Sequence, residues 1–180
     1  ADPQLVVATR GAEPVAEVYA RAAKEAGHPV DADLLKEAFG EAFAESGDPA
    51  WHAHPHDDGD AAERTWWEAV VAATFGRVLG SPLPEGFFTP VFQSLFSHYA
   101  APEAWHVFPE VPEVLQTSRD AGFKIAVVSN FDRRLHGILQ GHGLDFDLVV
   151  TSADARSRKP EARIFHHALG NSAIPLINLL

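Results

Sequence analysis

The spacing of apolar residues changes at Pro102, and this change constrains the fold more than any other feature of the sequence. Before it, residues 14–100 repeat apolar side chains at helical spacing, with almost no strand signal. After it, short β-branched runs alternate with helical patterns, in the order strand, helix, strand, helix, strand. That order is typical of a parallel sheet with right-handed crossover helices. The chain therefore predicts a helical region followed by an α/β unit.

Four amphipathic helices are predicted within residues 14–100. Pro14 suits the first turn of the first helix and Gly27 suits its end, while Asp31 or Asp33 can cap the second helix. The aromatic side chains are expected to form the core of this region, with an exposed aromatic face that docks a partner as the alternative. The predicted apolar faces run over Val15 to Ala26, Leu34 to Phe43, Trp66 to Leu79 and Phe88 to Tyr99.

Two compact β-branched runs, Lys124 to Val128 and Phe146 to Thr151, are the predicted parallel strands. A weak strand, Gln4 to Val7, precedes the helical region, and the sequence ends in another apolar run, Ile174 to Leu180. One short strand, a helical region and then an α/β unit together predict an α/β core with a helical insert. The core is assigned to residues 1–13 and 101–180, and the insert to residues 14–100. Helices are predicted around Val111 to Leu115, Leu135 to Leu139 and Ile164 to Ala168.

Composition and charge disfavour several classes of function. The 180 residues carry a net charge of −11 without a cluster of lysine and arginine, which disfavours nucleic acid and anionic membrane surfaces as partners. No apolar run approaches the roughly 20 residues of a membrane span. The absence of cysteine rules out disulfides and cysteine-ligated zinc, and it fits an intracellular location, in the cytoplasm or an organelle lumen. Because position 1 is not methionine, a leader could have been removed, and the compartment itself stays unknown.

Polar side chains follow both predicted parallel strands at their carboxyl ends, where open parallel sheets bind ligands. Ser129 and Asn130 follow the first strand, and the helix that opens near Asp132 aims free N–H groups at the same crevice. Thr151-Ser152 ends the second strand in the same way, and Lys159 follows in the next loop. A hydroxyl, backbone amides and an ammonium group can together hold a phosphate. These residues therefore predict a phosphate site.

Each of these residues also has an ordinary structural explanation. Serine, asparagine and aspartate are common in turns and at helix N-caps, and for Ser129 alone that explanation is about as good as a phosphate site. A single lysine before proline is usually a solvated loop residue. The combination, in order across one strand–helix–strand unit, is more specific than any of its members.

The stretches AGFKIAVVSNFDRRLHGIL and FDLVVTSADARSRKPEARIF resemble the haloacid dehalogenase-like hydrolases. EPVAEVYARAAKEAGHPV is similar to one subgroup of that family, the domain-containing protein 3 subgroup, and the resemblance extends roughly from Glu13 to Leu169. It implies a Rossmann-like α/β core with a parallel sheet and a helical cap inserted after the first strand. It also implies that Ser129 binds phosphate and that Lys159 steadies the nucleophile and the transferred group.

The carboxylates that carry the family's chemistry are missing from their expected places. In the family, an aspartate after the first strand attacks phosphorus, a second aspartate close by is the general acid and base, and Mg²⁺ spans the charge. The corresponding stretch here, LVVATRGAEPV, has no carboxylate before Glu13. The family's Gly-Asp metal motif is absent as well, because no acidic residue follows Glu161. No metal ligand can therefore be assigned.

Two accounts of these losses are open: a degenerate member kept for its fold, or a chain that lacks segments near residues 8–11 and 170–173. The first predicts an inactive protein that serves as a binding or assembly subunit with a protein partner. The second predicts an active Mg²⁺-dependent small-molecule phosphatase. A third hypothesis is a binder of phosphorylated ligands that uses Ser129, Asn130 and Lys159 without turnover. No cofactor is expected in the chain as given, and Mg²⁺ is expected only if the carboxylates exist in a longer product.

The segment WHAHPHDD gathers side chains of types that bind zinc or nickel. Glycine, proline and aspartate surround them, without a regular spacing on one element, which favours a solvated loop over an adventitious metal site. The residues concerned are His52, His54, His56, Asp57 and Asp58.

Overall fold

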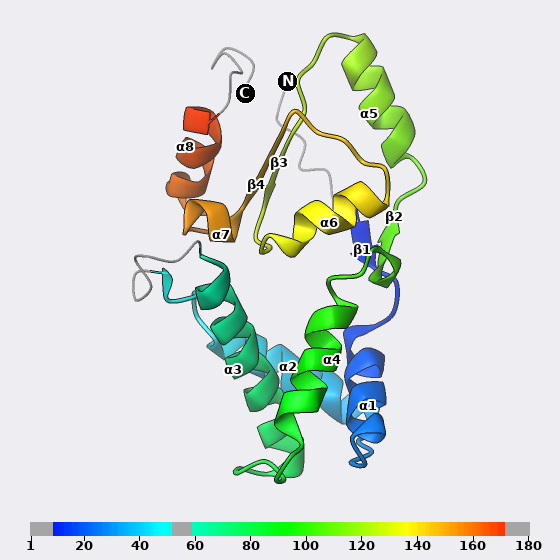
Figure 1. Ribbon diagram of the computed structural model, residues 1–180, viewed down its shortest axis with the longest axis vertical. Coiled ribbons are helices and arrows are strands. Elements are labelled where there is room, and N and C mark those ends of the chain that lie inside the picture. Colours follow the sequence, from blue (N-terminus) through cyan, green and yellow to red (C-terminus); the bar gives the residue numbers. More distant parts are fainter. Residues whose placement is uncertain (1–8, 52–58, 172–180) are drawn as a thin grey trace.

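The computed structural model describes residues 9–51 and 59–171, and its elements form two parts at opposite ends of the molecule (Figure 1). We call helices α1 to α4 the helical lobe, and the elements from α5 to α8 the α/β unit. The helical lobe contains α1 (Val15–Glu25), α2 (Ala32–Glu45), α3 (Asp60–Leu79) and α4 (Phe88–His98). The α/β unit contains α5 (Val111–Asp120), β3 (Ala126–Ser129), α6 (Arg134–Gly141), β4 (Leu148–Thr151), α7 (Ser152–Ala155) and α8 (Ala162–Asn171).

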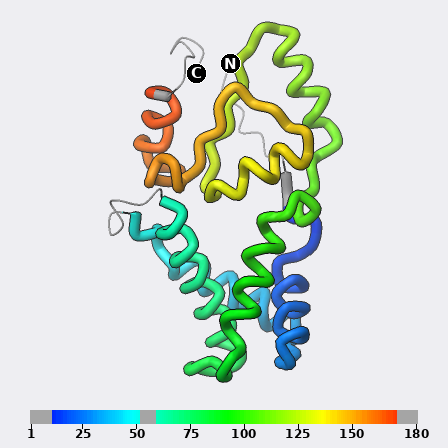
Figure 2. Tube along the Cα trace, in the orientation of Figure 1, coloured from blue at the N-terminus to red at the C-terminus, as the bar shows by residue number. Residues whose placement is uncertain are grey.

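The helical lobe is built around buried aromatic side chains. Phe75 is completely buried, stacks on Tyr19 with ring centroids 5.6 Å apart, and meets Phe87 edge-on at 5.0 Å. Such ring pairs add to the free energy gained from burying apolar area. Helix α1 lies beside α4 (Figure 2), and α2 packs against α3. Asp31 caps α2, because its carboxylate accepts hydrogen bonds from the N–H groups of Asp33 and Leu34.

Strands β3 and β4 are parallel, and apolar side chains cover both faces of the pair. Val127 belongs to a cluster with Leu135 and Leu139 of α6, whereas Val128 packs with Ile164 of α8 on the other face. Successive residues of a strand point to opposite faces, so a β-branched run of this kind fits a sheet that helices enclose on both sides. The helices thus hold the carboxyl ends of β3 and β4 in fixed positions.

Two short strands join the helical lobe to the α/β unit. β1 (Thr9–Gly11) precedes the lobe and pairs in antiparallel fashion with β2 (Trp105–Val107), which follows it after the 3₁₀ turn η2 (Pro102–Ala104). The Ala12 N–H extends the pairing by donating to the Ala104 carbonyl at 2.8 Å. The chain therefore enters and leaves the helical lobe at adjacent points.

Most of the predicted elements are present, and the predicted α/β fold class is confirmed. Helix α3 begins at Asp60 rather than near Trp66, and neither the β1–β2 pair nor α7 was predicted. The apolar runs Gln4 to Val7 and Ile174 to Leu180 lie outside the described residues, as does the histidine-rich segment. The boundaries of core and insert stay a prediction. In the described part of the chain, no helix is long and apolar enough to cross a membrane.

Candidate functional site

The carboxyl ends of β3 and β4 lie side by side, as the strand pattern predicts. Ser129 stands opposite Thr151 in the parallel register. Ser129 is half-buried, and its hydroxyl makes no hydrogen bond with another residue in the ranges 9–51 and 59–171. A polar group in that state is open to a ligand. Ser129 therefore keeps the position and the freedom that an anion site requires.

Asn130 attaches the Lys159 loop to the end of β3. Its Nδ2 donates to the Lys159 carbonyl at 3.0 Å, and its Oδ1 accepts from the Lys159 N–H at 2.6 Å. The amide thus bonds through both of its ends to one backbone unit. This contact makes Asn130 a positioning residue for Lys159. The ammonium group of Lys159 itself forms no ion pair with the residues that the structure describes.

Thr151 and Ser152 are used differently from Ser129, although they also follow a strand. Thr151 forms a capping box with Asp154: the Asp154 N–H donates to Thr151 Oγ1 at 3.2 Å, and the Thr151 N–H donates to Asp154 Oδ2 at 3.1 Å. Thr151 Oγ1 also donates to Asp154 Oδ2 at 2.7 Å. Ser152 Oγ lies 2.6 Å from Glu63 Oε1 and 3.2 Å from the Phe131 carbonyl oxygen. Both hydroxyls are buried within these contacts, so their role in this structure is to begin α7 and to bind the helical lobe.

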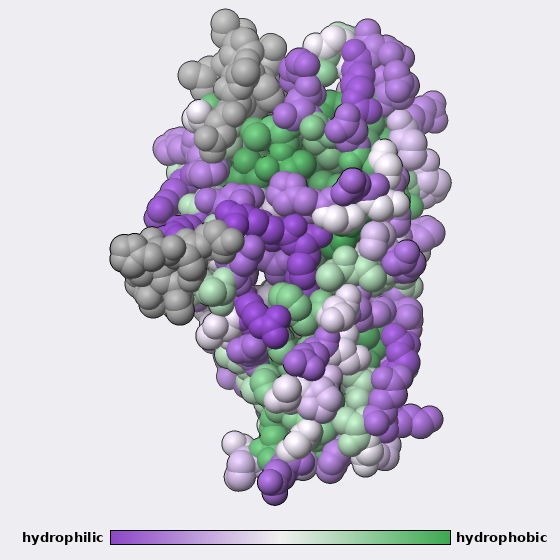
Figure 3. Space-filling model, viewed as in Figure 1, coloured by the Kyte–Doolittle hydropathy of each residue, from purple (hydrophilic) through white to green (hydrophobic). Residues whose placement is uncertain are grey.

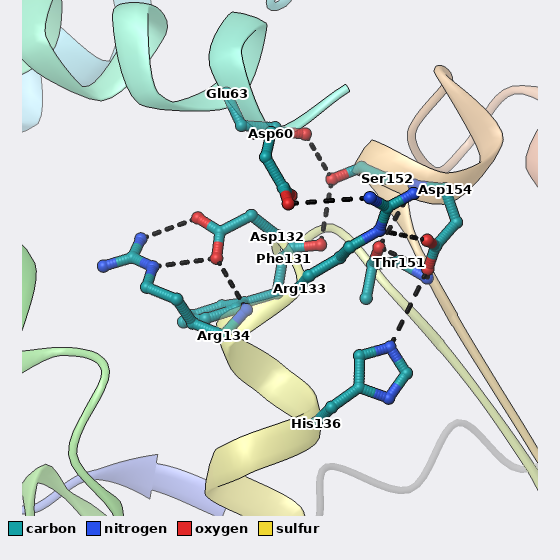
Figure 4. Close-up of polar contacts among 10 residues, drawn as sticks. All are labelled: Asp60, Glu63, Phe131, Asp132, Arg133, Arg134, His136, Thr151, Ser152 and Asp154. Atoms are coloured by element: carbon teal, nitrogen blue, oxygen red, sulfur yellow. Dashed lines mark hydrogen bonds and ion pairs between the residues drawn. The ribbon is translucent and has the colours of Figure 1, made fainter. Parts of the chain in front are cut away.

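Asp132 and Arg134 form a buried ion pair that reaches the helical lobe (Figure 4). Arg134 Nη2 and Nε donate to the two carboxylate oxygens of Asp132 at 2.7 and 2.8 Å. Arg134 Nη1 donates to the Phe96 carbonyl of α4 at 2.9 Å, and the guanidinium carbon lies 3.7 Å from the centre of the Phe96 ring. Asp132 also accepts from the N–H of Arg134, the first residue of α6, at 3.1 Å. This pair therefore both begins α6 and holds the lobe.

Arg133 joins the same interface from the other side of the loop. Its Nε donates to Asp154 Oδ1 at 2.7 Å, and its Nη1 lies 3.6 Å from Asp60 Oδ2 at the start of α3 (Figure 4). Partial burial acts to raise the pKa of Asp154, but hydrogen bonds from Thr151 and Arg133 outweigh it, and the pKa is lowered from its ordinary value. Asp154 is thus held as a carboxylate.

Glu63 is the buried acid at the centre of this interface. It projects from α3 and is only 4% exposed, yet its one hydrogen-bonded neighbour in Figure 4 is Ser152. Burial raises the pKa of Glu63 to about 6, while the hydrogen bond from Ser152 and the charge of Arg158 act in the opposite direction. A carboxyl group with this pKa changes its charge near neutral pH.

A third arginine completes the contact between the two parts. Arg158 Nη2 donates to the Gly47 carbonyl at 2.9 Å, its Nε contacts Asp48, and its guanidinium lies 5.7 Å from the centre of the Trp66 ring. Hydrophilic residues gather where the helical lobe meets the α/β unit in Figure 3. The loops that carry Ser129 and Lys159 are therefore braced against the lobe by charged side chains.

The described carboxylates near the strand ends do not suit Mg²⁺. In the ranges 9–51 and 59–171, no three His, Asp or Glu side chains are grouped closely enough to hold a metal ion. Asp132 is occupied by Arg134, Asp154 by Arg133 and Thr151, and Glu63 by Ser152. Mg²⁺ requires oxygen ligands that converge in near-octahedral geometry. The phosphate site at Ser129 and Lys159 stays a prediction.

The sequence patterns found the strand ends but missed the residues that brace them. The sequence predicts Asp132 only as the start of a helix, and it assigns no role to Arg133 and Arg134. The spacing Thr-x-x-Asp in TSAD is a capping-box signature, and it could have revealed α7 and the role of Thr151. The partnership of Glu63 with Ser152 joins residues 89 positions apart, and no local pattern predicts it.

A known protein family matches a range of the chain that includes β3, β4 and the loops after them. The model of the haloacid dehalogenase-like hydrolase family matches residues 7–174. This chain belongs to the haloacid dehalogenase-like hydrolase family. The resemblance that the strand-end motifs indicated is therefore confirmed.

Curated relatives carry the name haloacid dehalogenase-like hydrolase domain-containing protein 3. The mouse (Mus musculus) protein is 37% identical over 165 residues, which cover 89% of this chain and 63% of that protein. The human (Homo sapiens) protein is 35% identical over 160 residues, or 87% of this chain and 61% of that protein. The chain thus spans less than two thirds of their length. A solved structure, a HAD phosphatase from Thermococcus onnurineus, has a TM-score of 0.49 at 22% identity, over 86% of this chain and 60% of that one.

Proposed function

We propose that this chain is a family member without hydrolytic activity of its own, which serves as a binding or assembly subunit and holds a phosphorylated ligand at Ser129 and Lys159. One observation carries the proposal: in residues 9–51 and 59–171 the Ser129 hydroxyl has no hydrogen-bond partner, and the adjacent Asn130 bonds to the Lys159 backbone. In the same ranges Asp132 and Asp154 pair with arginines. A hydroxyl and an ammonium group bind a phosphate dianion without a chemical step. Hydrolysis in this family would need a nucleophilic carboxylate, and Glu63, Asp132 and Asp154 have other partners.

Calorimetric titration with inorganic phosphate tests the anion site. We expect the wild-type chain to bind phosphate at millimolar concentration or below, and Ser129→Ala and Lys159→Ala each to weaken binding about tenfold or more, as loss of a charge-assisted hydrogen bond does. Lys124→Ala is the matched control, because Lys124 pairs with Asp147 at the amino end of β3. No heat of binding at millimolar phosphate would rule out the site.

An assay with p-nitrophenyl phosphate and Mg²⁺ tests the inactivity. The expected result is no turnover above the rate of buffer alone. Turnover that disappears in Lys159→Ala would overturn the proposal, because it would show that the chain supplies a nucleophile. If no turnover is found, the mass of the complex that the tagged chain forms in its native host tests whether the inactive chain has a protein partner.

The second candidate is a Mg²⁺-dependent small-molecule phosphatase, in which the catalytic carboxylates belong to segments of a longer product. The observation that favours it is the length of the curated relatives: this chain covers 61% to 66% of the mouse, zebrafish, human and bovine proteins. Mass spectrometry of the natural protein distinguishes the candidates. A mass well above 19.5 kDa, together with Mg²⁺-dependent turnover by that protein, would favour the phosphatase.

A further inference from the structure

Ser152 stands between two oxygen atoms where α3 meets α7 (Figure 4). Its Oγ lies 2.6 Å from Glu63 Oε1 and 3.2 Å from the Phe131 carbonyl oxygen. A hydroxyl carries one proton, so it can donate a full hydrogen bond to only one of the two oxygens. The other contact is a hydrogen bond only if Glu63 supplies a second proton.

A neutral Glu63 turns both contacts into hydrogen bonds. Its carboxyl group donates to Ser152 Oγ, and the Ser152 hydroxyl then donates to the Phe131 carbonyl. An ionised Glu63 accepts the Ser152 proton instead, and the Phe131 carbonyl is left with the Ser152 N–H, at 3.1 Å, as its donor from this residue. The observed packing of α3 on α7 therefore makes one more hydrogen bond with the acid than with its carboxylate.

The charged groups around Glu63 do not compensate its ionised form. Asp132, in the loop after β3, is a negative charge that acts to raise the pKa of Glu63. Arg158 acts to lower that pKa, but its guanidinium donates to the Gly47 carbonyl and contacts Asp48. In residues 9–51 and 59–171, no lysine or arginine forms an ion pair with Glu63. The carboxylate is therefore buried without a cation of its own, which is costly.

Two other charged contacts border this one. Arg133 donates to Asp154 and lies 3.6 Å from Asp60 Oδ2, so it pairs with those two carboxylates. His136 Nε2 lies 3.9 Å from Asp154 Oδ2, within the α/β unit. Histidine side chains also change their charge between about pH 5 and 8. A test of Glu63 must therefore separate its titration from that of His136.

We propose that the Glu63–Ser152 contact is a pH-sensitive switch: neutral Glu63 holds the start of α3 on α7, and ionised Glu63 releases it. Release brings the carboxylate into water and separates Gly59, the residue before α3, from the Ala153 carbonyl of α7 that it closely approaches. The β1–β2 pair lies on the other side of the molecule from α7 (Figure 1), so it can stay paired while α3 moves. The switch is independent of the proposed phosphate site.

The direction of the switch follows from proton linkage. Burial raises the pKa of Glu63 to about 6, against the opposing effects of Ser152, Arg158 and Trp51, whereas the ordinary value is 4.5. A released Glu63 has the ordinary value in water, so the held form is favoured at low pH and loses its advantage as the pH rises through 6. The ratio of held to released molecules should then fall about eightfold between about pH 5 and pH 7.5.

The distance between two spin labels measures this ratio. Because the chain has no cysteine, Ala69→Cys in α3 and His166→Cys in α8 give two unique, exposed label positions. Helices α3 and α8 lie on the same side of the molecule as α7 (Figure 1), so release should lengthen the distance between the labels. Double electron–electron resonance should find one short distance at about pH 5, and a longer one in a larger share of the molecules at about pH 7.5.

Three variants of the labelled chain identify the group that titrates. Glu63→Gln has no charge to gain, and its amide can still donate to Ser152, so the short distance should predominate at both pH values. Glu17→Gln removes an exposed carboxylate of α1 and should respond to pH as the wild type does. Ser152→Ala removes the hydroxyl between the two oxygens, so the longer distance should already be present at the lower pH.

Circular dichroism at both pH values establishes that each chain is folded. Wild-type distances that are the same at both pH values overturn the proposal. So does a Glu63→Gln chain that responds like the wild type, because another group, such as His136, then controls the distance. A Ser152→Ala chain that keeps only the short distance at the lower pH overturns the route through the hydroxyl.

Discussion

Glu63 shows at the level of a single side chain how the two parts of the molecule are joined. The residue belongs to α3, but its hydrogen-bonded partner, Ser152, begins α7 in the other part. The charge of Asp132 acts to raise the pKa of Glu63 and that of Arg158 acts to lower it, and burial dominates both. The contact of Glu63 with Ser152, which joins the helical lobe to the α/β unit, therefore depends on whether Glu63 is protonated.

Glu63 predicts that the free energy of unfolding depends on pH. The folded pKa, about 6, exceeds the ordinary value of 4.5, so the folded state holds the proton more tightly than the unfolded chain. The resulting stability is fully present below pH 4.5 and is lost as the pH rises through 6, by about 2 kcal/mol. Urea denaturation at pH 4.5 and pH 7 measures it against Glu63→Gln, which cannot titrate. Equal pH dependence in the wild type and Glu63→Gln would contradict the expectation, and Glu68→Gln on the same helix is the control.

Asn130 predicts a loss of ligand affinity without a direct contact to the ligand. Asn130→Ala removes both hydrogen bonds to the Lys159 backbone and should cost about 1 kcal/mol of stability, since the site is exposed to water. It should weaken phosphate binding nearly as much as Lys159→Ala does. The double variant should then bind no more weakly than Lys159→Ala alone, and fully additive losses in calorimetry would show that Asn130 contacts phosphate itself.

The difference between Ser129 and Thr151 explains how far the site could be predicted from sequence. Both follow a β-branched strand, and the period-2 pattern placed both at one edge of the sheet. Thr151 caps a helix because Asp154 stands three residues later, which is a local relation that the sequence contains. The contacts of Asn130 with Lys159 and of Glu63 with Ser152 bridge residues far apart in sequence. Their partners depend on tertiary packing, so local patterns could not predict them.

Among the elements, α3 of the helical lobe packs against α7 of the α/β unit. Gly59 stands directly before α3 with a positive φ of 90°, and a Cβ atom there would overlap the Ala153 carbonyl oxygen. This packing explains why α3 begins earlier than the aromatic pattern indicated. The apolar face starts near Trp66, while the first turn of the helix is fixed by contacts with the α/β unit through Asp60 and Glu63. Periodicity detects the packed face of a helix and not the turn that precedes it.

The approach of α3 to α7 predicts opposite effects for two glycine substitutions. Gly59→Ala should destabilise the fold by about 1–3 kcal/mol, because the added methyl group meets backbone and the left-handed conformation strains alanine. Gly76→Ala lies inside the same helix with no atom within 4 Å of its added Cβ, and should raise stability by up to about 1 kcal/mol. Thermal and urea denaturation give both values. Equal effects of the two substitutions would contradict the close packing of Gly59.

At the scale of the whole molecule, three arginines of the α/β unit connect it to the helical lobe. Arg133, Arg134 and Arg158 reach Asp60, the Phe96 carbonyl and the Gly47 carbonyl, respectively. Of these, Arg134 is the most buried, with a side chain that is 14% exposed beside an Asp132 side chain that is 5% exposed. Removing one partner of such a buried ion pair lowers the free energy of unfolding strongly, because the remaining charge stays in a poorly hydrated position.

Arg134→Ala should therefore destabilise the whole fold by about 3–5 kcal/mol, as expected for a buried carboxylate that loses its counter-ion. Arg77→Ala is the matched control, because Arg77 pairs with the exposed Glu41 and Glu45 within the helical lobe, and its loss should cost about 1 kcal/mol or less. Urea denaturation monitored by tryptophan fluorescence measures both. If Asp132→Asn combined with Arg134→Ala restores no stability, the cost arises from lost packing on Phe96 rather than from the unpaired charge.

The β1–β2 pair has a consequence for how such a molecule can be built. Because these strands are antiparallel neighbours, the two ends of the helical lobe are separated by the width of one strand pairing. A short turn could join Gly11 to Trp105 directly, and the genetic segment between them could be cut out or replaced by another of different length. The β1–β2 pair is thus a common attachment point for inserts of different length. One scaffold could exchange its entire helical lobe in a single recombination event while the strand end that carries Ser129 and the loop that carries Lys159 keep their places.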